Sequence, residues 1–180
     1  MSSFANRILL SAKLNPEVYE EVEADRTAMG QAVAVVIISS IAAGIGTIQQ
    51  TGLGGLLLGS LLALTGWIVW AGLTYYIGTR FLPEPQTQAD YGELLRTIGF
   101  ASSPGIIRVL GIIPGLTSIV FLVAAVWMLA AMVIAVRQAL DYRSTWRALG
   151  VCLIGWVIQA LLTMLVFALV GGPPHQAPAG

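Results

Sequence analysis

Long uncharged apolar segments alternate with short charged ones along the 180-residue chain. Residues 27–79 contain no charged side chain, and this interval is too long for one membrane-spanning helix. The polar sequence TIQQTG at 47–52 divides it, and two further apolar segments follow later in the chain. The pattern predicts membrane-spanning helices near residues 29–46, 53–78, 116–136 and 148–170. At about 1.5 Å per residue, each can cross a hydrocarbon layer of about 30 Å.

A fifth apolar segment, residues 97–113, is shorter and less regular than the other four. Asp90 and Glu93 precede it with the spacing of a capping box, which predicts a helix that begins near Tyr91 while still in water. The apolar part is 17 residues long, at the short end of what can span a bilayer.

Prolines divide and end this fifth segment. Ser103 before Pro104 has the pattern of a second N-cap, so we expect the helix to be kinked or restarted there. The sequence IIPG, which contains Pro114, marks the end of the segment. Arg108 lies between the two prolines, inside a region that otherwise suits lipid.

Loop charge favours a crossing of residues 97–113 over a re-entrant segment. If the segment crosses, all basic side chains outside the spans share one face of the membrane and the opposite loops hold none. These side chains are Arg7, Lys13, Arg26, Arg80, Arg96, Arg137, Arg143 and Arg147. A re-entrant segment would move the last three to the other face. The positive-inside rule therefore predicts a five-span helical bundle with a broken third helix, a cytoplasmic N-terminus and an outside C-terminus.

The N-terminal segment has the pattern of two short helices rather than of a signal peptide. Phe4, Ile8 and Leu9 recur at helical spacing, and Arg7 and Lys13 are available for a polar face, which is typical of a helix in the headgroup region. An Asn-Pro pair then predicts the start of a second, acidic helix that we expect to stay in water.

Composition supports an all-α integral membrane protein with one membrane domain. The chain is 57% hydrophobic and 10% charged, against about 25% charged in soluble proteins. Its mean hydropathy is +0.83. We expect a cytoplasmic segment at 1–28, a membrane domain at 29–170 and a disordered tail at 171–180. With zero net charge and no basic cluster, nucleic acid is not an expected partner.

Pairs of small residues four apart mark places where helices can approach closely. We expect them to bring the first two spans together within one chain, and a homodimer face is the alternative interpretation. The pairs are Ser40 and Gly44, Ala42 and Gly46, and Gly55 and Gly59.

Arg108 is the candidate functional residue with three possible roles. In the first, its guanidinium ties the broken third helix to two acceptors, the carbonyl of Phe100 left without a donor by Pro104, and the side chain of Gln159. In the second, the long side chain snorkels to the membrane boundary. In the third, Arg108 lines a pathway for a small solute or anion.

Enzymatic chemistry finds little support in the sequence. The predicted spans contain no His, Asp or Glu that could act as a base or a metal ligand. Cys152 lies in an apolar segment, which favours a structural thiol, and His175 lies in the tail. We therefore expect no catalytic residue, no metal site and no cofactor.

Three sequences carry a family resemblance, namely LNPEVYEEVEAD (14–25), QADYGELLRTIGFASSPGIIRVLGIIPGL (88–116) and VRQALDYRSTWRALGV (136–151). Together they are similar to bacterial members of the Ypt/Rab-interacting-protein (Yip) domain family. The resemblance covers essentially the whole chain and implies a multi-pass protein of the bacterial inner membrane. Eukaryotic relatives are linked to Rab GTPases and vesicle traffic, but the chain has no GTPase-docking or prenyl-binding feature.

These observations favour a membrane scaffold or accessory protein without chemistry of its own. It would bind other membrane proteins or organise the surrounding lipid, and residues 1–28, 80–96 and 137–147 would form its cytoplasmic docking surface. The alternative is an oligomeric channel or transporter for a small solute or anion that uses Arg108.

Overall fold

The computed structural model describes residues 2–170, and within them the chain forms helices and connections with no strand. The predicted tail at 171–180, with His175, lies outside the described residues. The elements in chain order are α1 (Phe4–Ala12), α2 (Pro16–Ala24), η1 (Arg26–Ala28), α3 (Met29–Gly46), α4 (Ile48–Tyr76), η2 (Ile77–Phe81), α5 (Tyr91–Phe100), η3 (Ser103–Ile112), α6 (Thr117–Ala139) and α7 (Thr145–Val170).

Four helical stretches are long and apolar enough to cross a membrane, and they agree with the four regular segments of the sequence. They are Arg26–Gly46, Ile48–Phe81, Thr117–Ala139 and Thr145–Leu162. The division predicted at residues 47–52 is confirmed, because Gly52 adopts a φ of 64° and interrupts the helical backbone there. Only glycine takes up that conformation without strain, so the chain reverses at this position and the long part of α4 follows.

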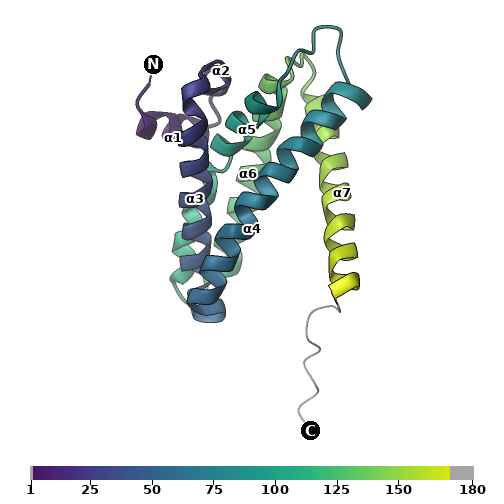
Figure 1. Ribbon diagram of the computed structural model, residues 1–180. Coiled ribbons are helices and arrows are strands. Elements are labelled where there is room, and N and C mark those ends of the chain that lie inside the picture. The colour runs from purple at the N-terminus through teal and green to yellow at the C-terminus, as the bar shows by residue number, and fades with distance from the viewer. Residues whose placement is uncertain (1, 171–180) are drawn as a thin grey trace.

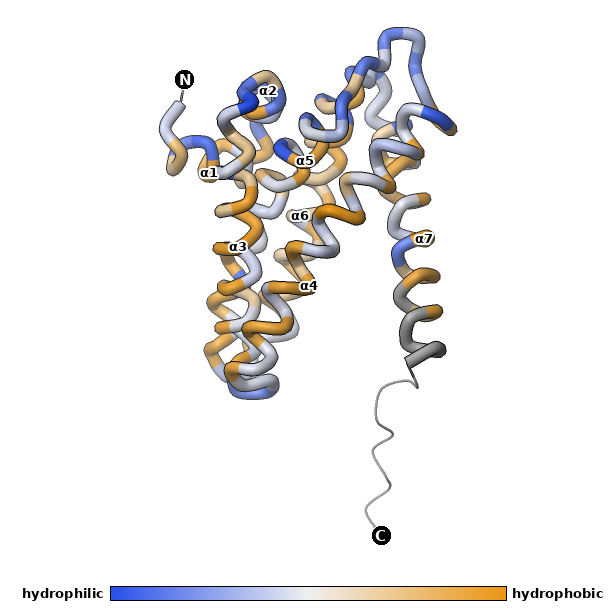
Figure 2. Tube along the Cα trace, viewed as in Figure 1, coloured by the Kyte–Doolittle hydropathy of each residue, from blue (hydrophilic) through white to orange (hydrophobic). Residues whose placement is uncertain are grey.

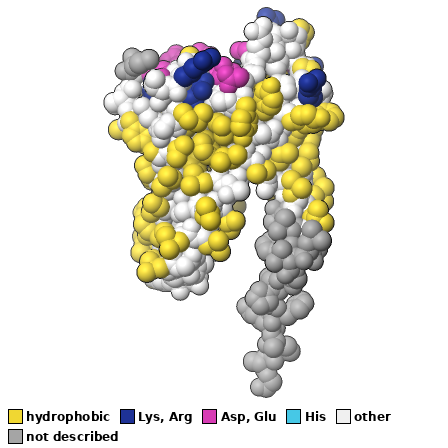
Figure 3. Space-filling model, viewed as in Figure 1, with side chains coloured by type: hydrophobic (Ala, Val, Ile, Leu, Met, Phe, Trp, Pro, Cys, Tyr) yellow, Lys and Arg dark blue, Asp and Glu magenta, His cyan; other side chains and the backbone are white. Residues whose placement is uncertain are grey.

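α3 and α4 separate toward the end that carries α1 and α2, whereas α4 and α7 separate toward the opposite end (Figure 1). α3 and α4 meet at their turn, α6 lies behind them, and α7 stands apart on the other side of α4. Hydrophilic residues gather at the end that carries α1 and α2 and at the α3–α4 turn, while the helices between are mostly hydrophobic (Figure 2). Acidic and basic side chains cluster at the α1–α2 end (Figure 3).

The buried core lies toward the α1–α2 end of the bundle. The N-cap predicted from the Asn-Pro sequence is confirmed, since Asn15 Oδ1 accepts a hydrogen bond from the Glu17 amide at 2.9 Å. α2 is not surrounded by water on all sides, because Val18, Tyr19 and Val22 are buried against the rest of the chain. Their spacing gives α2 an apolar face that packs against α5 and α6, with its acidic side chains around the edge.

α5 begins where the capping box predicts. The Glu93 amide donates to Asp90 Oδ1 at 2.9 Å, and the Asp90 amide donates to Glu93 Oε2 at 2.8 Å. α5 ends at Phe100, and the 3-10 helix η3 begins at Ser103. Trp67 of α4 fixes α5 from the side, because its indole N–H donates to the Leu95 carbonyl at 3.0 Å.

Candidate functional site

Arg7 is buried rather than placed on a polar face as its position in the helical pattern predicted. Its side chain is 2% exposed and forms ion pairs with Glu21 Oε1 at 3.0 Å and Asp25 Oδ2 at 2.8 Å. Its Nη1 donates to Gln31 Oε1 at 2.9 Å. One guanidinium therefore ties α1 to the C-terminal part of α2, to the residue that caps α2, and to the first turn of α3.

The two carboxylates around Arg7 are held in their charged form. Hydrogen bonds from the hydroxyl and amide of Ser2, followed by the ion pair with Arg7, lower the pKa of Glu21 from 4.5 to about 2. Hydrogen bonds from the Thr27 hydroxyl and from Arg7 lower the pKa of Asp25 from 3.8 to about 2. Glu21 and Asp25, the two ion-pair partners of Arg7, are therefore both charged at neutral pH.

Arg96 binds the same C-terminal end of α2 through the helix backbone. The sequence placed this side chain at the membrane interface, but it is buried and 5% exposed. Its Nε donates to the Val22 carbonyl at 3.0 Å, and its Nη2 donates to the Glu23 carbonyl. A cation bonded to the last carbonyls of a helix satisfies acceptors that lack an intrahelical partner and complements the helix dipole. Arg96 thereby sets the position of Glu23.

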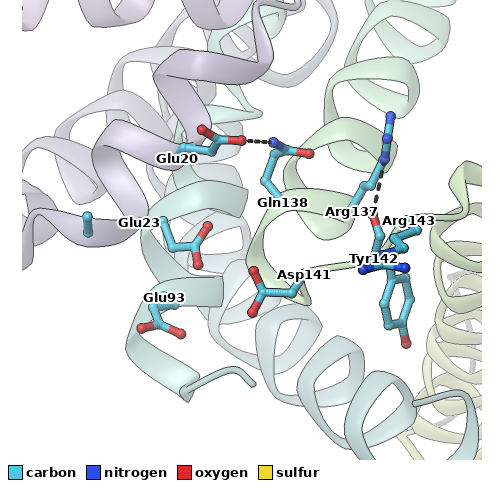
Figure 4. Close-up of a pocket in the computed structure, with 9 residues that line it drawn as sticks. Glu20, Glu23, Glu93, Arg137, Gln138, Asp141, Tyr142 and Arg143 are labelled. Carbon is cyan, nitrogen blue, oxygen red and sulfur yellow. Dashed lines mark hydrogen bonds between the residues drawn. The ribbon is translucent and has the colours of Figure 1, made fainter. Parts of the chain in front are cut away.

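An acidic pocket of about 500 Å³ lies between α2, α5 and the end of α6 (Figure 4). Glu23 and Asp141 face one another across it, and Glu93 lies below them in that view. Glu20 Oε1 accepts a hydrogen bond from Gln138 Nε2 at 2.6 Å. The pocket is lined by Glu20, Glu23, Ala24, Glu93, Arg137, Gln138, Asp141, Tyr142 and Arg143. We call these residues the acidic pocket.

Glu23 is the carboxyl in the acidic pocket whose pKa is raised. Burial, and then the charges of Glu93, Asp141 and Glu20, raise the pKa of Glu23 from 4.5 to about 8, against a smaller opposing effect of Arg96. A carboxyl with such a pKa can exchange a proton near neutral pH or respond to a cation nearby. Within residues 2–170, no group of three or more His, Cys, Asp or Glu side chains is arranged to hold a metal ion.

We expect the acidic pocket to make stability fall as the pH rises. The pKa of Glu23 is higher in the folded chain than its value of 4.5 in an unfolded one, so from about pH 4.5 to about pH 8 the unfolded state releases the proton first. The thermal unfolding temperature in detergent should therefore decrease across this range. Glu23→Gln should flatten the decrease, and Glu17→Gln, at an exposed position of the same helix, should leave it unchanged. An equal slope in wild type and Glu23→Gln would contradict this prediction.

Arg108 lies in η3 and binds the neighbouring helix α3. Its Nη2 donates to Ser39 Oγ at 2.9 Å and to the Ser39 carbonyl at 3.2 Å, and its Nε donates to the Gly105 carbonyl at 3.0 Å. Its Cζ lies 5.9 Å from the ring centroid of Phe121. Arg108 thus ties η3 to another helix, as the first of its three predicted roles requires. The acceptors that it bonds belong to Ser39 and Gly105, whereas the prediction named Phe100 and Gln159.

The acceptor predicted for Arg108 at the helix break has a different donor. Ser103 is not the N-cap of a second helix, because its hydroxyl donates to the Phe100 carbonyl at 2.7 Å. Pro104 follows directly and is buried at the start of η3. The hydroxyl of Ser103 thus takes the place of the amide donor that Pro104 lacks. The Phe100 carbonyl therefore does not need the predicted hydrogen bond from Arg108.

The geometry of η3 brings small residues to the face that meets α3. Gly105, Arg108 and Gly111 are spaced three apart and share one face of a 3-10 helix. A Cβ at Gly105 would lie 2.3 Å from Ser39 Oγ, and one at Gly111 would lie 3.1 Å from the Gly46 carbonyl oxygen. The absence of side chains on either side of Arg108 allows the two backbones to approach closely.

The other predicted site residues lie at the end of η3 and beside it. Pro114 and Gly115 form a turn, in which Gly115 has a φ of 84° and the Leu116 amide donates to the Ile113 carbonyl at 3.1 Å. A proline followed by a glycine with positive φ is typical of a type II turn. Gln159 of α7 lines the same hollow as Arg108.

The small-residue pairs differ in what they pack against. Gly44 faces α4, because a Cβ there would lie 2.7 Å from Leu56 Cγ. Ser40 is buried and donates to the Ile37 carbonyl at 2.9 Å. The prediction for Gly59 is wrong, since a Cβ there would meet no heavy atom within 4 Å, and at Gly55 it would meet Thr51 of the preceding turn. Gly55 and Gly59 line a hollow between α4 and α3 instead of a close contact.

Arg108→Leu is expected to lower the free energy of unfolding in detergent by about 1–3 kcal/mol, although leucine is more apolar. The loss arises because Ser39 and Gly105 keep buried acceptors without their donor. Arg108→Lys should recover part of the stability, since lysine lacks the planar guanidinium that reaches both acceptors. In a double variant with Ser39→Ala the losses should be less than additive. Wild-type stability of Arg108→Leu would exclude this role.

Sequence reasoning missed the burial of Arg7, the raised pKa of Glu23 and the role of Gly105. An arginine in α1 and several carboxylates in α2 were a weak signal for the burial of Arg7, because two short helices joined by three residues can pack against one another. For Gly105, its spacing of three from Arg108 was a signal, but only in a 3-10 helix. The acidic pocket had no local signal, since its residues come from three distant segments.

Four long apolar helices around a small buried core define a multi-pass helical membrane protein. The family model of the Yip1 domain matches residues 14–167, which is most of the chain. The chain therefore belongs to the Yip1 domain family. Comparison with curated proteins and with solved structures found no significant match.

Proposed function

We propose that this protein is an integral membrane scaffold that binds other membrane proteins through the acidic pocket and has no chemistry of its own. The observation that carries the proposal is the meeting of three segments that loop charge assigns to the cytoplasm. Glu23 comes from residues 1–28, Glu93 from residues 80–96 and Asp141 from residues 137–147, and all three line one pocket. Membership of the Yip1 domain family supports a membrane accessory role.

The charge of the acidic pocket favours a partner with a basic segment. Burial is the largest cause of the raised pKa of Glu23, and repulsion from the neighbouring carboxylates is the next. A lysine or arginine of a partner placed among Glu23, Glu93 and Asp141 would relieve that repulsion. Arg7 and Arg96 hold α2 on the bundle, so the pocket is formed before a partner arrives.

Site-directed photo-crosslinking in cells tests this proposal. A photoreactive amino acid in place of Ala24, which is exposed and lines the pocket, should give an adduct with one other membrane protein. The same amino acid in place of Leu122, which is 66% exposed on α6, is the matched control. Glu23→Gln combined with Asp141→Asn should abolish the Ala24 adduct. An adduct unchanged in that double variant, or none at Ala24, would contradict the proposed docking surface.

We propose five spans, with α5 and η3 together forming the third. Their lengths support this: the four residues of α5 from Thr97 to Phe100 cover about 6 Å and the ten residues of η3 about 20 Å, which together come close to a hydrocarbon layer of about 30 Å. The family resemblance and the loop charges support a bacterial inner membrane with a cytoplasmic N-terminus. A reporter fused after Gly180 should therefore be active only outside the cytoplasm, and activity inside would reduce the spans to four.

No contact in the described part of the chain favours the alternative of an oligomeric channel or transporter that uses Arg108.

A further inference from the structure

Three adjoining hollows form a groove among α3, α4, η3, α6 and α7. The first, of about 200 Å³, begins at Thr47 and Thr51 beside the α3–α4 turn and reaches Arg108. The second, of about 310 Å³, shares Arg108 with the first and extends to Trp70. The third, of about 500 Å³, shares Trp70 with the second and ends at Trp156. We call these hollows the intramembrane groove.

The groove carries polar groups at one end and becomes more apolar along its length. Thr47, Thr51 and Ser40 line the hollow next to the α3–α4 turn. Apart from the indole of Trp70, the far hollow has a lining of alkyl, sulfur and aromatic groups, namely Ala125, Val126, Met128, Leu129, Met132, Cys152, Leu153 and Trp156. On the face shown in Figure 3, viewed as in Figure 1, the molecule is hollowed between α7 and the other helices. A groove with one polar and one apolar end matches an amphiphile.

Arg108 places an uncompensated positive charge at the junction of the first two hollows. Its hydrogen-bond acceptors, Ser39 and Gly105, are neutral, and it forms no ion pair within the described part of the chain. The nearest acidic residue before Arg108 in the sequence is Glu93 and the nearest after it is Asp141, and both line the acidic pocket. A cation in a membrane-embedded site is costly unless an anion neutralises it.

We propose that the intramembrane groove binds an anionic membrane lipid. The negatively charged oxygen atoms of the head group are bound by Arg108, and the acyl chain runs past Trp70 into the hollow that ends at Trp156. The polar hollow at Thr47 and Thr51 admits the head group from the α3–α4 end. Because Arg108 lies four residues before the end of η3, or about 8 Å at the rise of a 3-10 helix, the head group sits just inside that boundary.

The charge and the shape of the groove select the occupant. A neutral lipid would fill the apolar hollow but leave Arg108 uncompensated, whereas a free phosphate would meet Arg108 but leave the apolar hollow empty. A lipid with an anionic head group satisfies both ends. Carboxylate and phosphate head groups share this chemistry, and the experiment separates them.

Tryptophan quenching by brominated lipids tests the proposal with the full chain. The purified protein is reconstituted in phosphatidylcholine vesicles that contain brominated phosphatidylglycerol, brominated fatty acid or brominated phosphatidylcholine. The part of the quenching that Trp70→Phe removes reports the groove. It should be saturable, with relative affinity about tenfold higher for an anionic probe than for the neutral one, as expected for a charge-assisted bond. The preferred anionic probe identifies the head group.

Two variants locate the binding site within the chain. Arg108→Gln should abolish the preference for anionic over neutral probes. Gly66→Phe fills the second hollow, where a Cβ at Gly66 has no heavy atom within 4 Å, and should reduce Trp70 quenching by every probe without strain in the bundle. Gly54→Phe, at an exposed position of the same helix with equal space, is the matched control. Equal quenching by anionic and neutral probes, or an unchanged Gly66→Phe variant, would overturn the proposal.

Discussion

Arg7→Met is expected to lower the free energy of unfolding by about 3–5 kcal/mol, because it removes one partner of a buried ionic network. The side chain of Arg7 is 2% exposed, and methionine would fill its volume without its charge. Glu21 and Asp25 would then remain beside an apolar side chain. Chemical unfolding in detergent, followed by tryptophan fluorescence, measures the loss.

The pH dependence of this loss separates the ionic network from simple packing. The pKa values of Glu21 and Asp25 are lowered to about 2 in the folded chain, so their contribution is complete above about pH 4.5 and disappears as the pH falls toward 2. The difference between wild type and Arg7→Met should therefore shrink below about pH 4. Lys13→Met, at an exposed position after the same helix, should change stability by less than about 0.5 kcal/mol. A difference that stays constant with pH would mean that Arg7 acts through packing alone.

Gly46→Ala is expected to lower the free energy of unfolding by about 3 kcal/mol, at the upper end of the usual cost of overpacking. A Cβ at Gly46 would lie 2.1 Å from the Arg108 carbonyl oxygen, which belongs to the backbone and cannot rotate away. The α3–η3 interface would have to separate, and the bonds from Arg108 to Ser39 would lengthen with it. Thermal unfolding in detergent measures the effect.

Gly59→Ala is the matched control for Gly46→Ala. Both glycines belong to the small-residue spacings of the first two spans, but a Cβ at Gly59 meets no heavy atom within 4 Å. Alanine there should keep or slightly raise stability, since it favours the helix over glycine. Equal losses at both positions would show that helix contacts in the membrane differ from those described.

The apolar segments and caps could be predicted because they depend on neighbouring residues. The Asp90–Glu93 capping box, the Asn15 N-cap and the reversal that contains Gly52 all lie where their local sequences place them. Each involves groups at most a few residues apart, so no tertiary information is needed.

The pairing of distant charged residues could not be predicted from the same pattern. Arg7 meets Glu21 and Asp25 only after the chain reverses at Leu14, which has a φ of 62° that local rules assign to glycine or asparagine. Helical periodicity places Arg7 opposite the apolar side chains and therefore toward water. Tertiary packing covers that face as well.

The sequence pattern could not predict the helix type of η3 either. A sequence with proline at the start and two glycines six residues apart fits an α-helix or a 3-10 helix, and the choice follows from contacts with α3 and α6. The partner of Arg108 depended on that choice, because only the 3-10 form puts Gly105 and Gly111 in line with it. Ser39 could not be found from its own neighbourhood.

The ten residues of η3 also set a distance. As a 3-10 helix they extend about 20 Å, whereas an α-helix of ten residues would extend about 15 Å. Within the five-span arrangement proposed above, conversion to an α-helix would draw the Pro114 turn about 5 Å into the hydrocarbon layer. Gly46 would lose its place opposite Gly111. In that proposed arrangement, the pairing of these glycines matches the length of the third span to the thickness of the bilayer, and a thinner membrane would work against it.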